Sequence, residues 1–326
     1  MPARATPLIA YDPQRARVPL PPLIEAGARL AFAWLRNQYG LRDRRPLGRF
    51  AARTAEFLAL GRRQPLVEAE MGSLSVLVST ADRTIARSVY TSGDWDPLLV
   101  GTVFEALDEM EVPYRGSTFL EVGANFGVYS LPAVTDYGFA RAIAYEPDPQ
   151  AFELLEQNIA RNGLADRVTA HHAALSSVPG ELMLSLGSFN AGDNRIVDAA
   201  DAGQQTVRVP ARTLDDEVAA GCIEPADLGL VWLDVQGHEY EVLLGARSLI
   251  ESSKAALVVE YCTWMMDDPT RRGLEQLIAD SYDVMVDLGW SALTDQLRFQ
   301  PASAVAALAA DGRAVETDLL LLHRPQ

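Results

Sequence analysis

Cysteine is almost absent from this sequence. Cys222 and Cys262 are the only two among 326 residues, and no CxxC or Cys/His spacing accompanies them. A disulfide framework or a structural zinc site needs more ligands than these, so we expect neither. The default compartment for such a chain is the reducing cytoplasm.

Long apolar runs are also missing. No stretch approaches the roughly 20 apolar residues that a membrane-spanning helix needs. The N-terminus likewise has no apolar segment of the kind that signal peptides contain. With 48% hydrophobic and 22% charged residues, the composition is typical of a globular protein that can bury a large core. The sequence therefore predicts a soluble, cytoplasmic protein without a membrane span.

Positive charge is scarce outside the N-terminal segment. Residues 1–65 contain 12 of the 28 basic residues and 4 of the 44 acidic ones, so they carry a net charge of +8 and the remainder of the chain carries −24. Nucleic-acid binding needs clustered Lys and Arg, so the acidic remainder argues against a nucleic-acid substrate. Two roles stay open for the basic segment: contact with a membrane surface or a partner, and a solvated extension attracted to its own acidic body.

Hydrophobic periodicity divides the chain into three parts. We expect a basic, partly helical extension over 1–65, a β-hairpin with a lead-in over 66–98, and an α/β domain over 99–326. Within the extension, helices are expected over 23–39 and 47–60, and the apolar face of the first leaves a homodimer open. The hairpin is expected to pair Val67–Glu70 with Ser73–Val78.

Strands and helices then alternate, which is typical of a parallel sheet in an α/β domain. The expected strands are Thr118–Val122, Ala142–Glu146, Val168–Ala173, Gly229–Asp234, Ala256–Tyr261, Asp283–Asp287 and Thr317–His323. The expected helices are Asp96–Met110, Tyr129–Asp136, Pro149–Asn162, Glu239–Ser248 and Arg271–Ser281.

The segment FLEVGANFGVYS, residues 119–130, leads from an apolar strand through a glycine turn into a helix. Glycine lets the backbone pass close to a ligand, and the start of a helix offers free N–H donors. The carboxylate of Glu121 would repel a pyrophosphate, which disfavours a dinucleotide, but it suits a cation such as the α-amino group of S-adenosylmethionine. The candidate binding residues of this segment are Glu121, Gly123, Ala124, Asn125 and Gly127.

A second acid, Glu146 in AIAYEPDP, ends the next expected strand, about 20 residues beyond the glycine turn. An acid at that place accepts hydrogen bonds from a ribose diol. A solvated carboxylate at a strand end is the structural alternative. Together the two acids and the glycine turn predict a nucleoside-containing ligand.

Four segments resemble the FkbM family of methyltransferases, which is named for an O-methyltransferase of polyketide biosynthesis. They are FLEVGANFGVYS, AYEPDPQAFELLEQNIARNGL, VTAHHAALSS and WLDVQGHEYEVLLGA. They occur in the family's order and spacing, and the similarity covers residues 85–323. Many class I methyltransferases share the first two segments, whereas D-x-x-G-x-E followed by V-L-x-G-A is more particular to this family.

The resemblance implies a Rossmann-like class I fold with a seven-stranded, mostly parallel sheet whose last strand is antiparallel. It also implies S-adenosylmethionine as cofactor, S-adenosylhomocysteine as product, and usually a hydroxyl acceptor. By the motif matches, the glycine-turn residues would line the methionine end of the cofactor, and Glu146 would hold the ribose. His172 and Ala173 would lie beside adenine, with Pro147 and Asp148 on the same rim.

The segment Asp234-Val235-Gln236-Gly237-His238-Glu239 ends one expected strand and opens the next helix. Ligands bind at this edge of open α/β sheets, so Asp234 is a candidate for contact with the methyl donor or the acceptor. His238 is a candidate general base, and Glu239 could orient it or cap the helix. Helix capping alone also explains acids at this place. The family commonly has Glu where Gln236 stands, which leaves a metal-assisted mechanism in doubt.

The long connection before the fourth expected strand carries polar residues suited to an acceptor. An ordinary Asn/Asp/Gly turn explains the same residues equally well. Further candidates for the wall of a binding pocket lie at the end of the fifth expected strand. The candidate substrate-binding residues are Asn190, Asp193, Asn194, Arg195, Glu260 and Trp264. We expect no metal site, because the neighbours His171 and His172 would point to opposite faces of a strand.

These features predict O-methylation of a hydroxyl on a small molecule or glycan, such as a natural product or a saccharide. N-methylation on the same fold is an alternative that needs less help from a base. An NAD-dependent oxidoreductase would want G-x-G-x-x-G at the first turn, and this chain has Gly123-x-x-x-Gly127. A non-catalytic cofactor-binding or scaffold protein would bind the cofactor and transfer no methyl group.

Overall fold

The structure is a computed structural model that describes residues 47–187, 191–197, 205–310, 312 and 314–324. The helix expected over 23–39 lies outside these ranges, as does most of the basic extension. Within the part that is described, no helix has the length and apolar character needed to cross a membrane.

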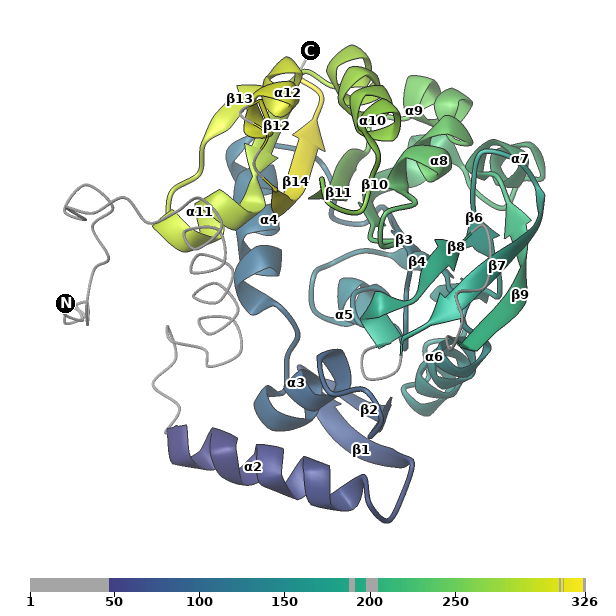
Figure 1. The fold of residues 1–326 in the computed structure, drawn as a ribbon, viewed down its shortest axis with the longest axis vertical. Helices are drawn as coiled ribbons and strands as arrows, with labels where there is room; N and C mark the ends of the chain where they lie inside the picture. The colour runs from purple at the N-terminus through teal and green to yellow at the C-terminus, as the bar shows by residue number, and fades with distance from the viewer. Residues whose placement is uncertain (1–46, 188–190, 198–204, 311, 313, 325–326) are drawn as a thin grey trace.

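An eight-stranded sheet forms the centre of the molecule, in the order β13-β12-β14-β11-β10-β3-β4-β5 (Figure 1). The five strands from β11 to β5 are parallel to one another, and β14 runs antiparallel to both β11 and β12. Their bounds are β3 Thr118–Val122, β4 Arg141–Tyr145, β5 Val168–His171, β10 Leu228–Leu233, β11 Ala256–Cys262, β12 Val284–Asp287, β13 Phe299–Pro301 and β14 Glu316–Leu322. The mostly parallel class I sheet with an antiparallel last strand is thus confirmed.

The sheet has one strand more than the seven expected. The additional strand β13 pairs antiparallel with β12, and Pro301 lies opposite Val284. Only three residues long and ending in proline, it shows no alternation of apolar and polar residues in the sequence. Proline is tolerated there because the strand lies at the edge of the sheet.

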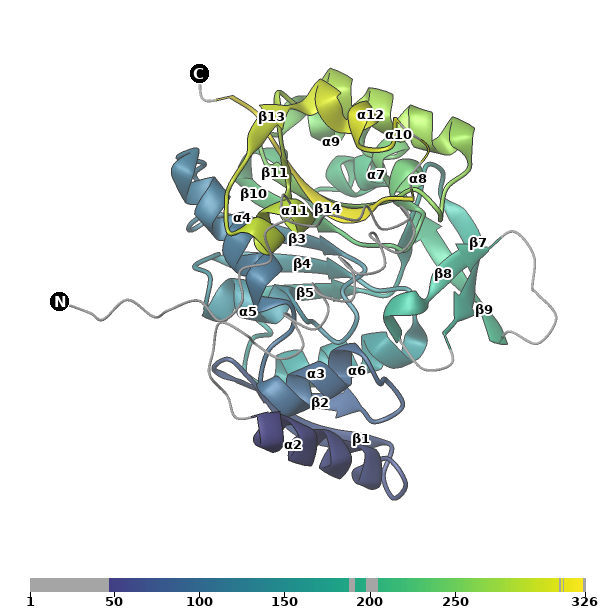
Figure 2. The ribbon, with the colours of Figure 1, turned by 60° about the vertical axis from the view of Figure 1, so that its left-hand side comes forward.

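Helices cover both faces of the sheet, and the strands are apolar on both sides for that reason. In β3, Phe119 belongs to one core cluster, while Leu120 and Val122 belong to the other. The first face carries α4 Pro97–Glu109, α5 Ser130–Thr135, α6 Pro149–Arg161 and α11 Leu288–Thr294. The second carries α7 Leu214–Ala219, α8 Glu239–Leu244, α9 Arg247–Ser252, α10 Asp268–Ser281 and α12 Val305–Leu308. Figure 2 shows the sheet between these two layers.

The N-terminal elements lie on the first layer of helices. They are α2 Leu47–Leu60, the hairpin strands β1 Leu66–Met71 and β2 Leu74–Ser79, and α3 Ile85–Ser92. The hairpin is confirmed, and two asparagines of α6 hold it in place. Asn158 Oδ1 accepts from the Leu77 N–H at 2.7 Å, and Asn162 Oδ1 accepts from the Ser75 N–H at 3.0 Å.

The connection between β5 and β10 forms a second, four-stranded sheet that the sequence analysis did not foresee. Its strands are β6 Ala174–Leu175, β7 Gly180–Leu186, β8 Arg195–Val197 and β9 Gln205–Arg212, in the order β6-β9-β7-β8. The expected strand 168–173 is therefore too long: β5 ends at His171, and the chain then enters the second sheet.

The single helix expected over 239–248 is wrong, because the structure has two short helices there, α8 and α9. Gly245 caps the end of α8, and a Cβ on it would collide with the backbone carbonyl of Ser176. The helix therefore ends where the second sheet passes close to it, a contact that only glycine permits.

Candidate active site

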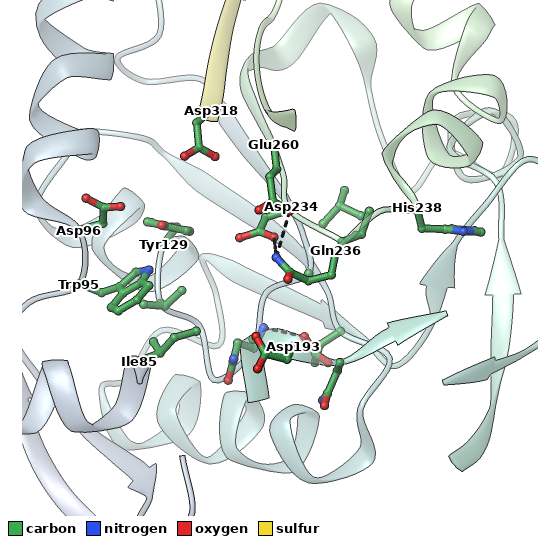
Figure 3. A pocket seen from close by; sticks show the side chains of 18 of the residues that line it. Ile85, Trp95, Asp96, Tyr129, Asp193, Asp234, Gln236, His238, Glu260 and Asp318 are labelled. Carbon is green, nitrogen blue, oxygen red and sulfur yellow. Dashed lines mark hydrogen bonds between the residues drawn. The ribbon is translucent and has the colours of Figure 1, made fainter. Parts of the chain in front are cut away.

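A pocket of about 410 Å³ opens at the edge where the parallel strands of the main sheet end (Figure 3). Its walls come from the carboxyl ends of β3, β4, β10 and β11, the amino end of the antiparallel β14, and the starts of α4 and α11. Sites for small molecules commonly have volumes of about 300–1,000 Å³. The position is also the one at which open α/β sheets bind ligands.

The glycine turn after β3 forms one wall. The N–H groups of Gly123 and Ala124 both donate to the carbonyl of Tyr145, at 2.9 and 3.0 Å. Gly123 has a φ of 91°, and a Cβ on it would collide with the backbone carbonyl of Asp234. Gly123 and Asn125 line the pocket, whereas Ala124 and Gly127 lie behind it and serve packing.

Glu146 is fixed against this turn. Its carboxylate accepts from the backbone N–H of Asn125 at 2.6 Å and from that of Asp148 at 2.7 Å. Only 5% of Glu146 is exposed, and burial raises its pKa to about 8, although both hydrogen bonds act in the opposite direction. A rigid, buried acid that can accept hydrogen bonds therefore lies on the pocket wall.

Glu121 does not line the pocket as expected. It shares a face of β3 with Phe119, so its carboxylate lies under the start of α5. There it accepts from the N–H groups of Tyr129 at 3.2 Å and Ser130 at 2.7 Å. These N–H groups have no partner within the helix, and burial raises the pKa of Glu121 to about 8. The structure thus gives Glu121 a role in holding the first turn of α5.

Gln236 connects two acids at the carboxyl ends of β10 and β11. Its Nε2 donates to Asp234 Oδ1 at 2.8 Å and to Glu260 Oε2 at 3.0 Å (Figure 3). Burial raises the pKa of both carboxyl groups, that of Glu260 to about 10, and the charge of Asp234 adds to the effect on Glu260. The neutral amide therefore separates two acids that would otherwise repel each other.

His238 and Glu239 follow on the same loop. His238 Nε2 lies 3.0 Å from Ser176 Oγ, and Figure 3 shows its side chain turned away from Asp234. Glu239 is fully buried, and its Oε1 accepts from the N–H groups of Val235 and Gly237, both at 3.1 Å. Glu239 therefore holds the shape of the loop through its backbone.

The connection before β10 reaches the rim of the pocket through Asn194. Its Nδ2 donates to Asp148 Oδ2 at 2.8 Å, and its Oδ1 accepts from the Gly187 N–H at 2.7 Å. Asp148 also accepts from the Gln150 N–H at the start of α6. These contacts fix the second sheet against the β4 end of the pocket.

The structure brings about half of the predicted site residues together. Those that line the pocket are Gly123, Asn125, Glu146, Pro147, Ala173, Asp193, Asn194, Asp234, His238 and Glu260. Those that lie outside its lining are Glu121, Ala124, Gly127, Asp148, His172, Arg195, Glu239 and Trp264. Asn190 lies outside the described residues.

Three of the residues outside the lining have other contacts. His172 stacks on the ring of Phe152. Trp264 is 57% exposed, and its Nε1 donates to Glu316 at 3.1 Å. Arg195 is exposed on β8, where it pairs with Ser185 of β7, so the structure does not place this candidate substrate-binding residue in the pocket lining.

Sequence reasoning missed several lining residues, above all Asp96, Tyr129 and Asp318. Asp96 precedes Pro97 and caps α4, which is a recognisable helix start. Asp318 lies near the amino end of the one antiparallel strand of the expected sheet. That end lies at the same edge as the carboxyl ends of the parallel strands, so the expected topology already placed this acid at the ligand-binding edge.

Backbone strain also gathers at the pocket. Asp96, Asn125 and Gln236 have positive φ angles of 45°, 50° and 54°, and all three line it. Such conformations cost free energy in residues other than glycine and cluster at functional sites. The strain supports the assignment of this pocket as the active site.

Residues 121–283, half of the chain, match the model of the Methyltransferase FkbM domain. The chain belongs to the FkbM methyltransferase family. Methyltransferase sdnD of Sordaria araneosa is 27% identical over 197 residues, which cover 52% of this chain and 74% of that protein. Hexuronic acid methyltransferase AglP of Haloferax volcanii is 28% identical over 138 residues, so the match spans 42% of this chain and about half, 53%, of AglP.

Among solved structures, the methyltransferase FkbM of Methylobacillus flagellatus is 15% identical, with a TM-score of 0.34. The alignment covers 83% of this FkbM methyltransferase and 59% of that chain. Membership in the family means dependence on S-adenosylmethionine.

Proposed function

We propose that this methyltransferase transfers a methyl group to a hydroxyl of a small molecule or glycan. The observation that carries the proposal is the form of the pocket. One side holds the glycine turn and Glu146, and the other is open and polar around Asp234 and Glu260. AglP, a relative by sequence, is named for action on a hexuronic acid, which supports a saccharide acceptor.

The first side of the pocket fits the cofactor. Glu146 keeps lone pairs for a ribose diol while its two backbone contacts hold it still. Gly123 brings backbone without a side chain to the wall, and Ala173 adds a small apolar residue to the lining, where it leaves room for a flat base. When bound, S-adenosylmethionine supplies a methyl group on a positively charged sulfur, and the sulfur keeps the electron pair of the bond that breaks.

Asp234 is the proposed base for the acceptor hydroxyl. It lines the pocket next to the glycine turn, and burial raises its pKa. A carboxylate with a raised pKa takes a proton more readily than an ordinary one, and general bases of this kind contribute about 10²–10⁴-fold to rates. The hydroxyl proton would pass to Asp234 as the new oxygen–carbon bond forms, while Gln236 holds the carboxylate in position.

N-methylation is the second candidate, because the lining is acidic and an amine would be attracted to it. A neutral amine also needs less assistance from a base. The two reactions are separated by locating the methyl group in the product with NMR. A methyl carbon bonded to oxygen supports the first candidate, and one bonded to nitrogen replaces it by the second.

Calorimetric titration with S-adenosylhomocysteine tests the cofactor side. We expect the wild type to bind it, Glu146→Ala to lose most of the affinity, and NAD not to bind. Binding of NAD in preference would revive the oxidoreductase alternative. Cofactor binding that persists in Asp234→Asn, with no methyl transfer by the wild type to any hydroxyl or amine, would instead favour the scaffold alternative.

A further inference from the structure

The part of the pocket away from the glycine turn is unusually acidic. We call Trp95, Asp96, Tyr129, Glu260 and Asp318 the acceptor half; they come from the residues directly before α4 and α5, and from β11 and β14 (Figure 3). The acids of the whole lining are Asp96, Glu146, Asp193, Asp234, Glu260, Glu316 and Asp318. No Lys or Arg is found among the lining residues in the described ranges. The methyl donor carries a single net positive charge, so it leaves most of these acids without a cationic partner.

Tyr129 provides a second and independent sign of a ligand. It is 8% exposed, and its ring stacks on Trp232 with 4.1 Å between the ring centroids. Its hydroxyl makes no hydrogen bond within the described residues, although Tyr129 lines the pocket. Buried polar groups are normally hydrogen-bonded, so a ligand in the pocket would supply the hydrogen-bond partner that this hydroxyl lacks.

The carboxylates around Tyr129 are also short of partners. Asp96 accepts one hydrogen bond, from the Leu99 N–H at 3.3 Å. The side chain of Asp318 makes none within the described residues. Figure 3 shows Tyr129 between Asp96 and Asp234, with Asp318 above it. The charges of all three act on the Tyr129 hydroxyl and, after burial, raise its pKa well above the usual value.

Burial without a nearby cation makes the ionised form of these carboxyl groups less stable. Burial raises the pKa of Asp96 to about 6 and that of Asp318 well above its usual value, and the charge of Asp234 raises the latter further. A cationic ligand would reverse these shifts, because an opposite charge stabilises the ionised carboxylate. An anionic ligand would meet only repulsion here.

We propose that the acceptor half binds a protonated amine, so that the methyl acceptor is an alcohol that also carries an ammonium group, such as an amino sugar. Asp96 and Asp318 would hold the ammonium group, and the Tyr129 hydroxyl would accept one of its hydrogen bonds. The inference rests on the proposed hydroxyl methylation and adds the charge of the acceptor to it. It also separates this protein from AglP, because a hexuronic acid is an anion at neutral pH.

A divalent metal ion is the competing occupant of an acidic pocket. Among the described residues, no group of three or more acids, histidines or cysteines is arranged to hold one. Gln236 places an amide nitrogen, which cannot bind a cation, between Asp234 and Glu260. The arrangement therefore favours an ammonium group, which several separate acceptors can share.

Calorimetry with three sugars on protein saturated with S-adenosylhomocysteine tests the proposal. D-glucosamine, D-glucose and D-glucuronate would be titrated at a pH at which the amine of glucosamine is protonated. We expect glucosamine to bind at least about tenfold more tightly than glucose, and glucuronate not to bind. Equal affinities for glucosamine and glucose, or no binding of glucosamine, overturn the proposal.

The variants Asp96→Asn and Asp318→Asn should bring the affinity for glucosamine to that for glucose, and Tyr129→Phe should weaken it in part. Asp268→Asn, an exposed acid on α10, is the matched control and should keep the preference. Retained S-adenosylhomocysteine binding shows that each variant is folded. Displacement of glucosamine by Mg²⁺ in the wild type would identify a metal site and overturn the proposal.

Failure of this inference can be distinguished from failure of the function on which it rests. Failure of the wild type to bind S-adenosylhomocysteine would contradict the methyltransferase assignment itself. Binding of the cofactor without a preference for glucosamine would contradict only the inference about the acceptor.

Discussion

The carboxylate of Glu146 is held by the backbone N–H of Asn125, with 2.6 Å between Oε2 and N. The acid at the end of β4 is thereby tied to the glycine turn after β3. Asn125 adopts a positive φ of 50° at this point. The contact couples the two sequence motifs that predicted a nucleoside-containing ligand.

Replacing Glu146 by Gln should weaken cofactor binding without unfolding the protein. The carboxylate accepts from two backbone N–H groups, and an amide nitrogen in place of one oxygen would face one of them donor to donor. We expect the affinity for S-adenosylhomocysteine to fall by at least about tenfold, as measured by calorimetry. The exposed Glu156→Gln on α6 is the control, and an equal loss in both variants would contradict a role in binding.

The Gln236→Glu substitution should destabilise the protein more at pH 8 than at pH 5. It replaces the donor shared by Asp234 and Glu260 with a third acid. The buried, acidic surroundings that raise the pKa of Asp234, and that of Glu260 to about 10, would also raise the pKa of the new carboxyl group. A group whose folded pKa lies above its unfolded pKa loses stability as the pH rises, so the loss is larger at pH 8 than at pH 5. We expect a loss of about 1–3 kcal/mol in the free energy of unfolding at pH 8, measured by urea denaturation.

Added Mg²⁺ should restore part of that stability, because three carboxylates form an oxygen site that a divalent cation can use. Gln276→Glu is the matched control, since Gln276 also donates to an acid, Asp280, but on the surface of α10. If Gln236→Glu lowered the free energy of unfolding equally at both pH values, the shape of Gln236 and not its lack of charge would be what stabilises the protein.

Much of the fold was accessible from the sequence. Strands such as Leu228–Leu233 are continuous apolar runs because both faces of the sheet are covered, and the alternation of strands with helices predicts that the strands are parallel. The second sheet was not accessible, because its strands β7 and β9 are half-exposed and carry mixed residues. The early end of α8 depends on a contact between Gly245 and Ser176, which lie far apart in the sequence.

The site residues that could be predicted are those whose motif fixes their position relative to a strand. Gly123, Glu146 and Asp234 follow strands directly, and the edge of the sheet brings them together. The motif did not predict the position of Glu121. Its side chain lies on the face of β3 that packs under the start of α5, and not on the side of the ligand. Trp95 and Asp96 directly precede α4, which lies outside the motifs, so only the packing of α4 brings them to the pocket.

Glu239→Gln should stabilise the protein at pH 8 and change little at pH 5. Burial raises the pKa of Glu239 to about 7, and its Oε2 makes no hydrogen bond within the described residues. Because the folded pKa lies above the unfolded one, the stability from this group is fully present below about pH 4.5 and is lost as the pH rises through about 7.

The glutamine side chain keeps an oxygen that accepts from the N–H groups of Val235 and Gly237. It cannot ionise, so the pH-dependent cost of the carboxyl group disappears. We expect a gain of about 1–3 kcal/mol at pH 8, measured by urea denaturation at both pH values. The exposed Glu251→Gln on α9 should show no such difference. A gain of the same size at pH 5 would show that the titration of Glu239 is not the cause.

Asp234→Asn should lower kcat far more than His238→Gln does. Asparagine keeps the acceptor for Gln236 but cannot take a proton, so the turnover of the wild-type acceptor should fall by about 10²–10⁴-fold. His238 is turned away from Asp234 and lies 3.0 Å from Ser176 Oγ, a contact that glutamine can reproduce. Its substitution should therefore change the rate by less than about tenfold.

Transfer of a labelled methyl group, measured beside the affinity for S-adenosylhomocysteine, separates loss of the base from loss of binding. A loss in His238→Gln as large as that in Asp234→Asn, at unchanged cofactor affinity, would assign the base to His238.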